Sequence, residues 1–277
     1  MSKKQNIDIE TVDGFGDEWE RFDQSELSTA ERERIFNSYF SVFPWNALPA
    51  DAEGFDLGCG SGRWAKEVAA RVGKLHCIDP SSALAVAKRN LADKSNCEFH
   101  AASVDHIPLD DASMDFGYAL GVLHHVPDTA AGIAACVAKL KAGAPFLVYL
   151  YYAFDNKPIW FKALWRVTDT LRKVVSSFPH TLRFVASQIL AVLIYWPLAR
   201  SANVLEKLGF NVSNIPLSSY RNHGFYTMRT DALDRFGTQL EQRFTKEQIQ
   251  EMMELAGLVR IKFSDAVPYW CAVGYKK

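Results

Sequence analysis

Short apolar segments alternate with helix-forming segments over much of this sequence, and this alternation restricts the fold more than any other feature. Five apolar runs of strand length, each bounded by turn or polar residues, precede residue 153: 54–57, 74–79, 97–102, 114–120 and 143–152. Apolar residues share one helical face in three of the intervening segments: Trp64, Val68 and Val72; Leu84, Ala87 and Leu91; Ile133, Val137 and Leu140. Repeated strand–helix–strand units with apolar strands predict a parallel sheet that helices cover on both faces.

The end of the chain returns to the same alternation. Thr245 is a predicted helix N-cap, with Gln248 at the capping-box position and Gly257 as the stop. Two strand-like runs follow, 259–265 and 269–277, and predict an antiparallel hairpin at the sheet edge. The fold class is therefore α/β, with a seven-stranded, mostly parallel sheet, helices on both faces and a C-terminal antiparallel hairpin.

Residues 153–243 interrupt the alternation and predict a helical insertion after the fifth strand. One helical face of its first part is apolar: Trp160, Leu164, Val167, Leu171 and Val174. Another face is mainly basic: Lys162, Arg166, Asp169 and Lys173. Further on, 184–199 has sixteen residues without a charge. Because a membrane span needs about 20 apolar residues, we predict a core-facing or interfacial helix here.

Charge is unevenly distributed. Residues 156–207 contain eight Lys and Arg against two acidic residues, whereas the whole chain has a net charge of -1. This asymmetry predicts an anionic partner, but not a nucleic acid, because the basic residues lie among long apolar runs. The inserted helices are predicted to cover a pocket and to bury their apolar faces against each other. The alternative is peripheral contact with an anionic membrane through 158–200.

The spacing of the cysteines and the first twenty residues indicate in which cellular compartment the protein is expected. The five cysteines lie far apart in the sequence and have no metal-ligand spacing, which favours a reducing compartment: Cys59, Cys77, Cys97, Cys136 and Cys271. The first twenty residues contain no apolar signal segment. We therefore expect a cytoplasmic location, with the inner face of the membrane as the site of any peripheral contact.

The segment DLGCGSGRWA, residues 56–65, places three glycines at alternate positions between a strand and a helix. Glycine lets the backbone turn tightly and approach a ligand closely. A dinucleotide site would have G-x-G-x-x-G, and a carboxylate such as Asp56 beside a pyrophosphate would repel it. The turn therefore favours a cationic or zwitterionic ligand and argues against a nicotinamide-dependent oxidoreductase.

DLGCGSG resembles the first motif of the class I S-adenosylmethionine (SAM)-dependent methyltransferases, in the group that includes the ubiquinone/menaquinone methyltransferases. The resemblance covers about 54–150 and 244–277. It includes HIPLDDASMDFGYALGVLHHVPD, which looks like the region around their fourth strand, and Asp79, which matches the acid that holds the ribose hydroxyls. It implies a Rossmann-like fold, SAM as the cofactor and methyl transfer as the activity.

The same resemblance implies a set of cofactor contacts: Asp56, Gly58, Cys59, Gly60, Gly62, Arg63, Asp79, Ser103, Val104 and Leu120. Ser103 stands where the family usually has an Asp for the adenine amino group, and Asp105 could substitute. Other roles remain open at this point. The glycines could serve helix packing alone, Asp79 could cap the next helix, and Arg63 could lie on the helix surface.

His124 and His125 follow the fourth strand and are the predicted general bases. Alternatively, one packs beneath the cofactor and the other caps the next turn. A metal site with Asp128 is disfavoured because adjacent histidines point in different directions, so no metal is predicted. Five polar and aromatic residues are predicted to form the acceptor wall, the alternative being a surface loop: Tyr220, Arg221, His223, Tyr226 and Arg229.

These observations predict an N-terminal helical cap (1–50), a SAM-binding core (51–152 and 244–277) and a substrate lid (153–243). The predicted activity is methylation, at O or N, of a small anionic or aromatic acceptor. One alternative is a membrane-associated methyltransferase of a quinone or other lipid. An alternative of another class is a noncatalytic SAM-fold binding or scaffold protein. The sequence names neither the acceptor nor the oligomeric state.

Overall fold

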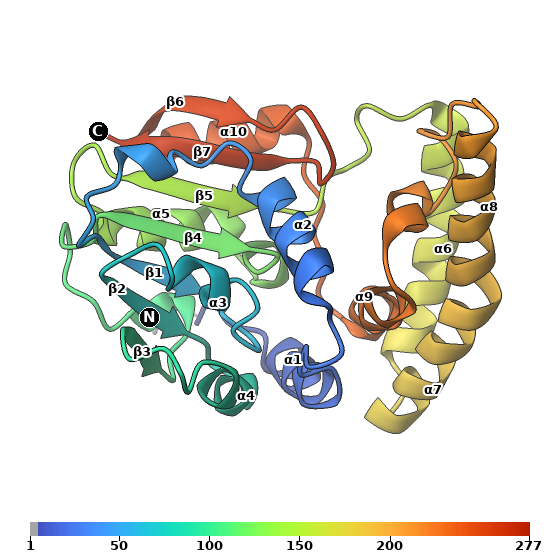
Figure 1. Cartoon of the computed structure of the whole chain (residues 1–277), viewed down its shortest axis with the longest axis horizontal. Helices are drawn as coiled ribbons and strands as arrows, with labels where there is room; N and C mark the ends of the chain where they lie inside the picture. Colours follow the sequence, from blue (N-terminus) through green and yellow to red (C-terminus); the bar gives the residue numbers. More distant parts are fainter. Residues whose placement is uncertain (1–4) are drawn as a thin grey trace. The chain divides into compact units, whose positions relative to one another are not determined.

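The computed structural model describes residues 5–277 and divides into two compact units (Figure 1). The sheet unit contains the described residues up to Gln24, together with Glu33–Ala153 and Leu240–Lys277. The helical unit contains Ser25–Arg32 and Phe154–Gln239. Helix α2 (Thr29–Tyr39) begins in the helical unit and ends in the sheet unit.

Seven strands form one sheet in the order β3-β2-β1-β4-β5-β7-β6. They are β1 (Glu53–Leu57), β2 (Lys74–Ile78), β3 (Cys97–His100), β4 (Phe116–Leu120), β5 (Pro145–Tyr149), β6 (Leu258–Phe263) and β7 (Cys271–Lys276). The first five pair in parallel, and β7 is antiparallel to both β5 and β6. The predicted sheet is confirmed. The chain order reverses between β1 and β4, so their carboxyl ends form the switch point at which open α/β sheets bind ligands.

Helices cover both faces of the sheet, as predicted (Figure 1). The elements are α1 (Ile9–Arg21), α2, α3 (Ala65–Val68), α4 (Ala83–Asn90), α5 (Thr129–Lys139), α10 (Lys246–Leu255) and the 3-10 turns η1 (Trp45–Ala47), η2 (Val104–His106) and η3 (Leu123–His125). Phe55 and Ile78 pack on the α5 and α10 side, whereas Leu75 and Cys77 pack on the α2 and α4 side. Apolar side chains of β2 therefore lie on both faces of the sheet.

Local signals determine where α10 begins and ends. The Thr245 side chain accepts a hydrogen bond from the Gln248 N–H, and the Gln248 side chain accepts one from the Thr245 N–H. Gly257 has φ +91°, a left-handed conformation that ends the helix. The predicted capping box and stop are both confirmed.

The helical unit contains α6 (Ile159–Ser176), α7 (His180–Leu190), a π turn η4 (Ala191–Tyr195), α8 (Trp196–Lys207), η5 (Ser218–Asn222) and α9 (Phe225–Gly237). The uncharged run 184–199 is therefore not one regular helix. Pro197 lies in the first turn of α8 and has no N–H to bond within the preceding turn, which accounts for the π turn there. Residues 219–231, predicted as a wall or a loop, are mostly helical in η5 and α9.

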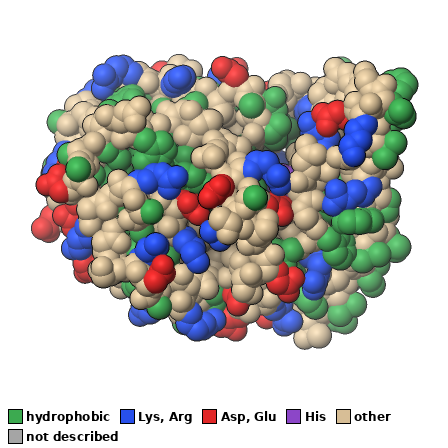
Figure 2. All heavy atoms as spheres, in the orientation of Figure 1, with side chains coloured by type: hydrophobic (Ala, Val, Ile, Leu, Met, Phe, Trp, Pro, Cys, Tyr) green, Lys and Arg blue, Asp and Glu red, His purple; other side chains and the backbone are tan. Residues whose placement is uncertain are grey.

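The predicted burial of the α6 apolar stripe is wrong. Trp160, Leu164, Val167, Leu171 and Val174 are 44–69% exposed. The core of this unit is formed by other residues, which include Val175, Ala191, Tyr195, Met228 and Phe236. Figure 2 shows hydrophobic side chains gathered on the surface of this unit, with Lys and Arg side chains among them. An 18-residue window within His180–Lys207 has a mean hydropathy of 1.6, so this helical segment is long and apolar enough to cross a membrane by length and composition alone.

Candidate functional site

The glycine turn after β1 has a backbone that only glycine adopts readily. Gly58, Gly60 and Gly62 all have positive φ, at +72°, +52° and +78°. A Cβ added to Gly58 would lie 2.3 Å from the Val122 side chain, and one added to Gly62 would lie 2.9 Å from Leu91. The glycines are therefore required by conformation and by packing. Packing alone, however, does not explain the polar groups around the turn.

Buried polar atoms without partners surround this turn. Asp56 is 1% exposed, and among the described residues neither of its carboxylate oxygens has a hydrogen-bond partner. The same holds within residues 5–277 for Ser61 Oγ and Arg63 Nε. Buried polar groups are normally satisfied, so an unsatisfied group points to an additional partner. A carboxylate, a hydroxyl and a guanidinium around one turn fit a zwitterion that carries an ammonium and a carboxylate.

Burial raises the pKa of Asp56 well above its ordinary value; the hydroxyl of Tyr118, opposite Asp56 on β4, partly opposes this shift, and the charge of Asp79 adds to it. The guanidinium of Arg63 lies 4.4 Å from the ring of Trp64. This stacking places Arg63 beside the protein rather than extended into solvent. Cys59, between the first two glycines, is buried.

Asp79 directly follows β2 and is hydrogen-bonded to the same turn. One of its oxygens accepts the N–H of Gly60 at 2.8 Å. The other accepts the N–H of Ser81 at 2.8 Å and its hydroxyl at 2.6 Å. Burial raises the pKa of Asp79, and these hydrogen bonds oppose the shift. Ser82 holds the N-cap position of α4 without a side-chain capping bond, and Asp79 bonds the N–H of Ser81 in the turn before it, so the capping alternative stays open beside the ribose role.

Ser103 and Val104 lie at η2, after β3. Ser103 is the N-cap residue of this turn and Val104 is buried, as is Leu120 at the end of β4. The Asp105 carboxylate accepts the backbone N–H of Asn6. The Asn6 side chain also exchanges two 2.7 Å hydrogen bonds with the backbone of Asp128. Asp105 therefore already has a structural partner, which leaves Ser103 as the better candidate for adenine.

Helix α1 lies over the turn. The Trp19 ring nitrogen is 3.0 Å from the position that a Cβ on Gly60 would occupy. The corresponding position on Gly16 is 2.6 Å from the Ser82 hydroxyl. The N-terminal helix thus covers both the glycine turn and the start of α4.

His124 and His125 form η3 and are both buried. His125 donates from Nδ1 to the carbonyl of Leu240 at 2.7 Å. The His124 ring stacks on Tyr151 at 3.9 Å, and within the part of the chain that the structure describes neither of its nitrogens has a hydrogen-bond partner. Burial lowers the pKa of His124 well below its ordinary value, with help from the charges of His125 and Arg243. His124 is thus held neutral.

The capping role considered for one histidine is wrong, because Asp128 caps α5. Its side chain accepts the N–H of Ala131 at 2.9 Å. This bond also commits the carboxylate that a metal site with His124 and His125 would need. The packing role fits His124, whereas the general-base assignments stay predictions.

Acid should destabilise the protein through His124. Its folded-state pKa lies below the ordinary value of 6.5, so below that pH the unfolded chain binds a proton that the folded chain does not. Stability contributed by neutral His124 is therefore present above 6.5 and is lost as the pH falls below it. Between pH 6.5 and 5.5 we expect a loss of about 1 kcal/mol that a His124→Phe variant, which keeps the stacked ring, does not show. Urea unfolding at both pH values measures this difference, and parallel pH profiles would contradict it.

Aromatic residues that the sequence analysis did not select gather at the carboxyl ends of β4 and β5. The Tyr149 ring is 5.0 Å from Tyr39 and 6.0 Å from Tyr151. The Arg243 guanidinium lies 5.0 Å from the ring of Tyr151 and pairs with Glu241 at 2.8 Å. The sequence did contain an indication of this aromatic cluster, because three tyrosines in the segment 149–152 continue the apolar fifth strand.

The predicted acceptor residues hold elements of the helical unit together. Arg221 pairs with Glu206 at 2.7 Å, and Arg229 donates to the Gln188 side chain at 2.6 Å. The remaining three are partly buried: Tyr220, which packs on Tyr195, His223, which pairs with Glu31, and Tyr226. These contacts explain the residues structurally, and their acceptor role stays a prediction.

Comparisons with known proteins fit this geometry. Residues 55–148 match the family described as "Methyltransferase domain". The ubiquinone biosynthesis O-methyltransferase of Aromatoleum aromaticum is 33% identical over 101 residues, which are 35% of this chain and 43% of that protein. The chain thus aligns with less than half the length of this curated relative.

Two solved structures share the fold across most of the chain. A candidate O-methyltransferase of Nostoc punctiforme aligns with a TM-score of 0.53 and 13% identity, over 93% of this chain and 60% of that one. A SAM-dependent methyltransferase of Thermotoga maritima aligns with a TM-score of 0.50 and 14% identity, over 95% and 100%. The predicted resemblance is confirmed at the level of the domain: residues 55–148 match a methyltransferase domain, on a fold that known methyltransferases share.

Proposed function

We propose that this protein transfers the methyl group of SAM to an oxygen or nitrogen of a small acceptor. The observation that carries the proposal is the buried Asp56 carboxylate, without a hydrogen-bond partner among residues 5–277, at a turn that also presents Ser61 and Arg63. A ligand with an ammonium and a carboxylate satisfies all three. The methionyl part of SAM has both groups.

In this proposal each residue of the turn has a defined partner. Asp56 accepts from the ammonium, Arg63 and Ser61 donate to the carboxylate, and Asp79 accepts from the ribose hydroxyls. Ser103 and the backbone of Val104 contact the adenine. When bound, SAM supplies an electrophilic methyl group. The chain must hold an acceptor atom about 3 Å from it and exclude water.

The aromatic residues near His124 support an aromatic acceptor. Tyr39, Tyr149 and Tyr151 place aromatic rings at the carboxyl end of the sheet, where open α/β sheets bind their ligands. His124, held neutral, has a free lone pair that can accept a proton from an acceptor hydroxyl or ammonium. His125 remains the second candidate for this role.

Replacing Asp79 by Ala should weaken binding of the product S-adenosylhomocysteine about 100-fold. The variant loses the charged acceptor for two hydroxyls, each worth about 1.5 kcal/mol or more. Isothermal titration measures the change, and Asp93→Ala, an exposed acid on the same unit, is the matched control. Equal affinity of Asp79→Ala and wild type would remove the ribose assignment. Tight product binding without methyl transfer to any acceptor would instead favour the noncatalytic alternative.

A second candidate is methylation of an amphiphilic acceptor, such as a quinone or another lipid, at an anionic membrane surface. Within residues 5–277, 19 large hydrophobic residues are exposed, and 16 of them lie between Ile159 and Phe210. Exposed apolar area of this extent marks a surface that binds something. Lys162, Arg166 and Lys173 lie on the same helix as the apolar stripe and suit anionic lipid. The name of the Aromatoleum relative, which refers to ubiquinone biosynthesis, also supports a lipid-like acceptor.

Vesicle flotation separates the two candidates. A protein with a water-soluble acceptor should stay in solution with phosphatidylcholine vesicles, with or without phosphatidylglycerol. A protein that takes its acceptor from the membrane should float with the anionic vesicles. It should also methylate a quinol embedded in them faster than one in detergent solution.

A further inference from the structure

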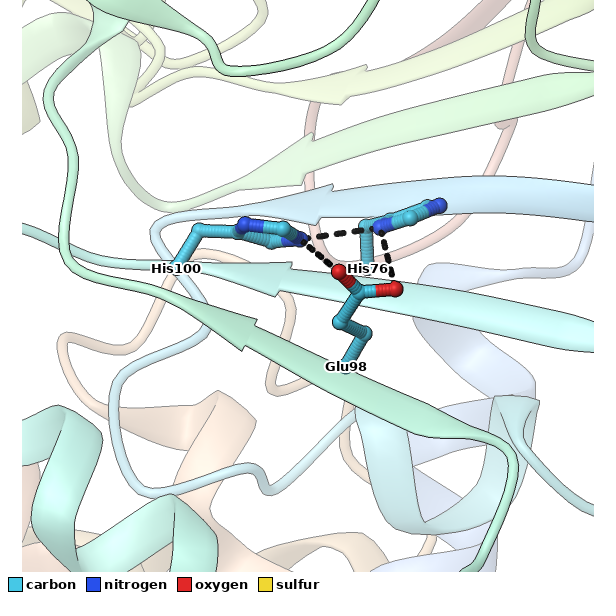
Figure 3. A group of neighbouring side chains, drawn as sticks. All are labelled: His76, Glu98 and His100. Atoms are coloured by element: carbon cyan, nitrogen blue, oxygen red, sulfur yellow. Dashed lines mark hydrogen bonds and ion pairs between the residues drawn. The ribbon is translucent and has the colours of Figure 1, made fainter.

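Two histidines and a glutamate meet on one face of the sheet (Figure 3). His76 lies in β2, and Glu98 and His100 lie in β3. The strands pair in parallel with His76 opposite Glu98, so all three side chains point to the same face. The register of the sheet therefore creates this cluster, and the function proposed above does not use it.

The spacing of the three groups suits a metal ion. Nδ1 of His76 lies 2.9 Å from Nε2 of His100. The Glu98 carboxylate lies 3.8 Å from the same His76 nitrogen and 3.7 Å from the same His100 nitrogen. Ligands bound tetrahedrally to zinc at about 2.0–2.1 Å lie about 3.3 Å apart. The observed separations bracket that value, so small side-chain adjustments would complete the site.

An outer carboxylate orients the buried histidine. Nε2 of His76 lies 2.8 Å from a carboxylate oxygen of Glu53, in β1. A carboxylate accepts hydrogen bonds, so this nitrogen carries the proton and Nδ1 presents its lone pair toward His100 and Glu98. The carboxylate–histidine–metal arrangement of known zinc sites has the same order of groups.

The cluster is open to solvent, and a neighbouring lysine competes with a metal ion for its carboxylates. The Glu98 side chain is 49% exposed and that of His100 is 17% exposed, whereas His76 is 5% exposed, so an ion can enter from solvent. The ammonium of Lys74 lies 2.8 Å from Glu98 and 3.1 Å from Glu53. This cation competes with a metal ion for the same carboxylates. It therefore limits the affinity of the site.

We propose that His76, His100 and Glu98 bind one divalent ion of the zinc class, with Glu53 as the outer carboxylate. Two imidazoles and one carboxylate favour Zn²⁺, Co²⁺ or Ni²⁺ over Mg²⁺ and Ca²⁺, which prefer all-oxygen sites. Three protein ligands leave the fourth position of a tetrahedral ion to water. The ion would join β2 to the edge strand β3.

Cobalt titration of the chelator-treated full chain tests the proposal. Wild type should bind one Co²⁺ with visible d–d absorption, and Zn²⁺ should displace it. His100→Ala, a change at the sheet edge, should weaken binding about 100-fold or more, and Glu53→Gln about tenfold. Lys74→Gln should bind more tightly than wild type, an outcome that misfolding cannot imitate. His180→Gln, which removes an exposed histidine of the other unit, is the control and should match wild type.

Two results would overturn the proposal. One is the absence of one-to-one Co²⁺ and Zn²⁺ binding by wild type, and the other is equal affinity in wild type and His100→Ala. Titration of S-adenosylhomocysteine into the same samples keeps this test separate from that of the proposed function. Metal binding without product binding would reject methyl transfer and leave the metal site standing.

Discussion

Replacing Asp56 by Asn should raise the melting temperature of the cofactor-free protein and, in the same variant, weaken binding of S-adenosylhomocysteine. The two effects have one origin. A buried carboxylate without a hydrogen-bond partner among the described residues destabilises the free fold, and the same carboxylate is available to a ligand ammonium. Few substitutions in the chain should move stability and binding in opposite directions.

The stability effect follows from the pKa. Burial raises the folded-state pKa of Asp56 above its ordinary value of 3.8, so the folded chain holds this proton more tightly than the unfolded chain. The contribution of Asp56 to stability is therefore largest below pH 3.8 and is lost as the pH rises through the folded-state pKa. At pH 7.5 the Asn variant avoids this loss. We expect a gain of about 1 kcal/mol, or about 2–4 °C in melting temperature.

The binding effect follows from the lost charge. A charge-assisted hydrogen bond is worth about 1.5–3 kcal/mol, so affinity for S-adenosylhomocysteine should fall about 10- to 100-fold. Asp51→Asn, at an exposed acid before β1, is the control and should change neither quantity. Scanning fluorimetry and isothermal titration provide the two readouts. A lower melting temperature with unchanged affinity would make Asp56 a structural acceptor and remove it from the cofactor site.

The centre of the sheet could be predicted from the sequence because β1, β4 and β5 are buried on both faces. Such strands have apolar residues at nearly every position, and polar residues and glycines separate them clearly. The helical unit was harder to predict because burial does not follow the apolar pattern of its helices. Its apolar positions have helical spacing, but the stripe through Leu164 and Leu171 is exposed while Arg172 is buried, ion-paired with Asp169 and bonded to the Thr238 carbonyl. Periodicity reveals that a face exists, not what covers it.

The candidate site also has one part that could be predicted from the sequence and one part that could not. Asp56, the glycines and Asp79 could be predicted because they lie within one turn and the end of the next strand. The surroundings of His124 could not, because Tyr151 and Arg243 are far apart in sequence and come together through the pairing of Tyr152 with Phe244. The His76 cluster likewise depends on the register of three strands. Spacing along the chain does not contain that register.

Replacing Leu164, Val167 and Leu171 together by Ser should abolish binding to vesicles that contain phosphatidylglycerol. These side chains are 44–69% exposed, so their removal should leave the fold intact. Each would contribute about 1–2 kcal/mol on entering the acyl boundary, and the triple variant should lose at least 100-fold in partitioning. Flotation of wild type and variant with the same vesicles measures the loss. Circular dichroism verifies the fold.

Two further variants identify the source of the affinity. Leu255→Ser removes an exposed apolar side chain of the sheet unit and should float like wild type. Lys162, Arg166 and Lys173 changed to Gln should weaken binding by about 1 kcal/mol per charge, and added salt should remove this difference because it screens the lipid charge. If the Ser triple variant floats as well as wild type, the exposed stripe does not bind the membrane. The acceptor must then reach the sheet unit from water, and the smaller anionic or aromatic acceptor becomes the one to test.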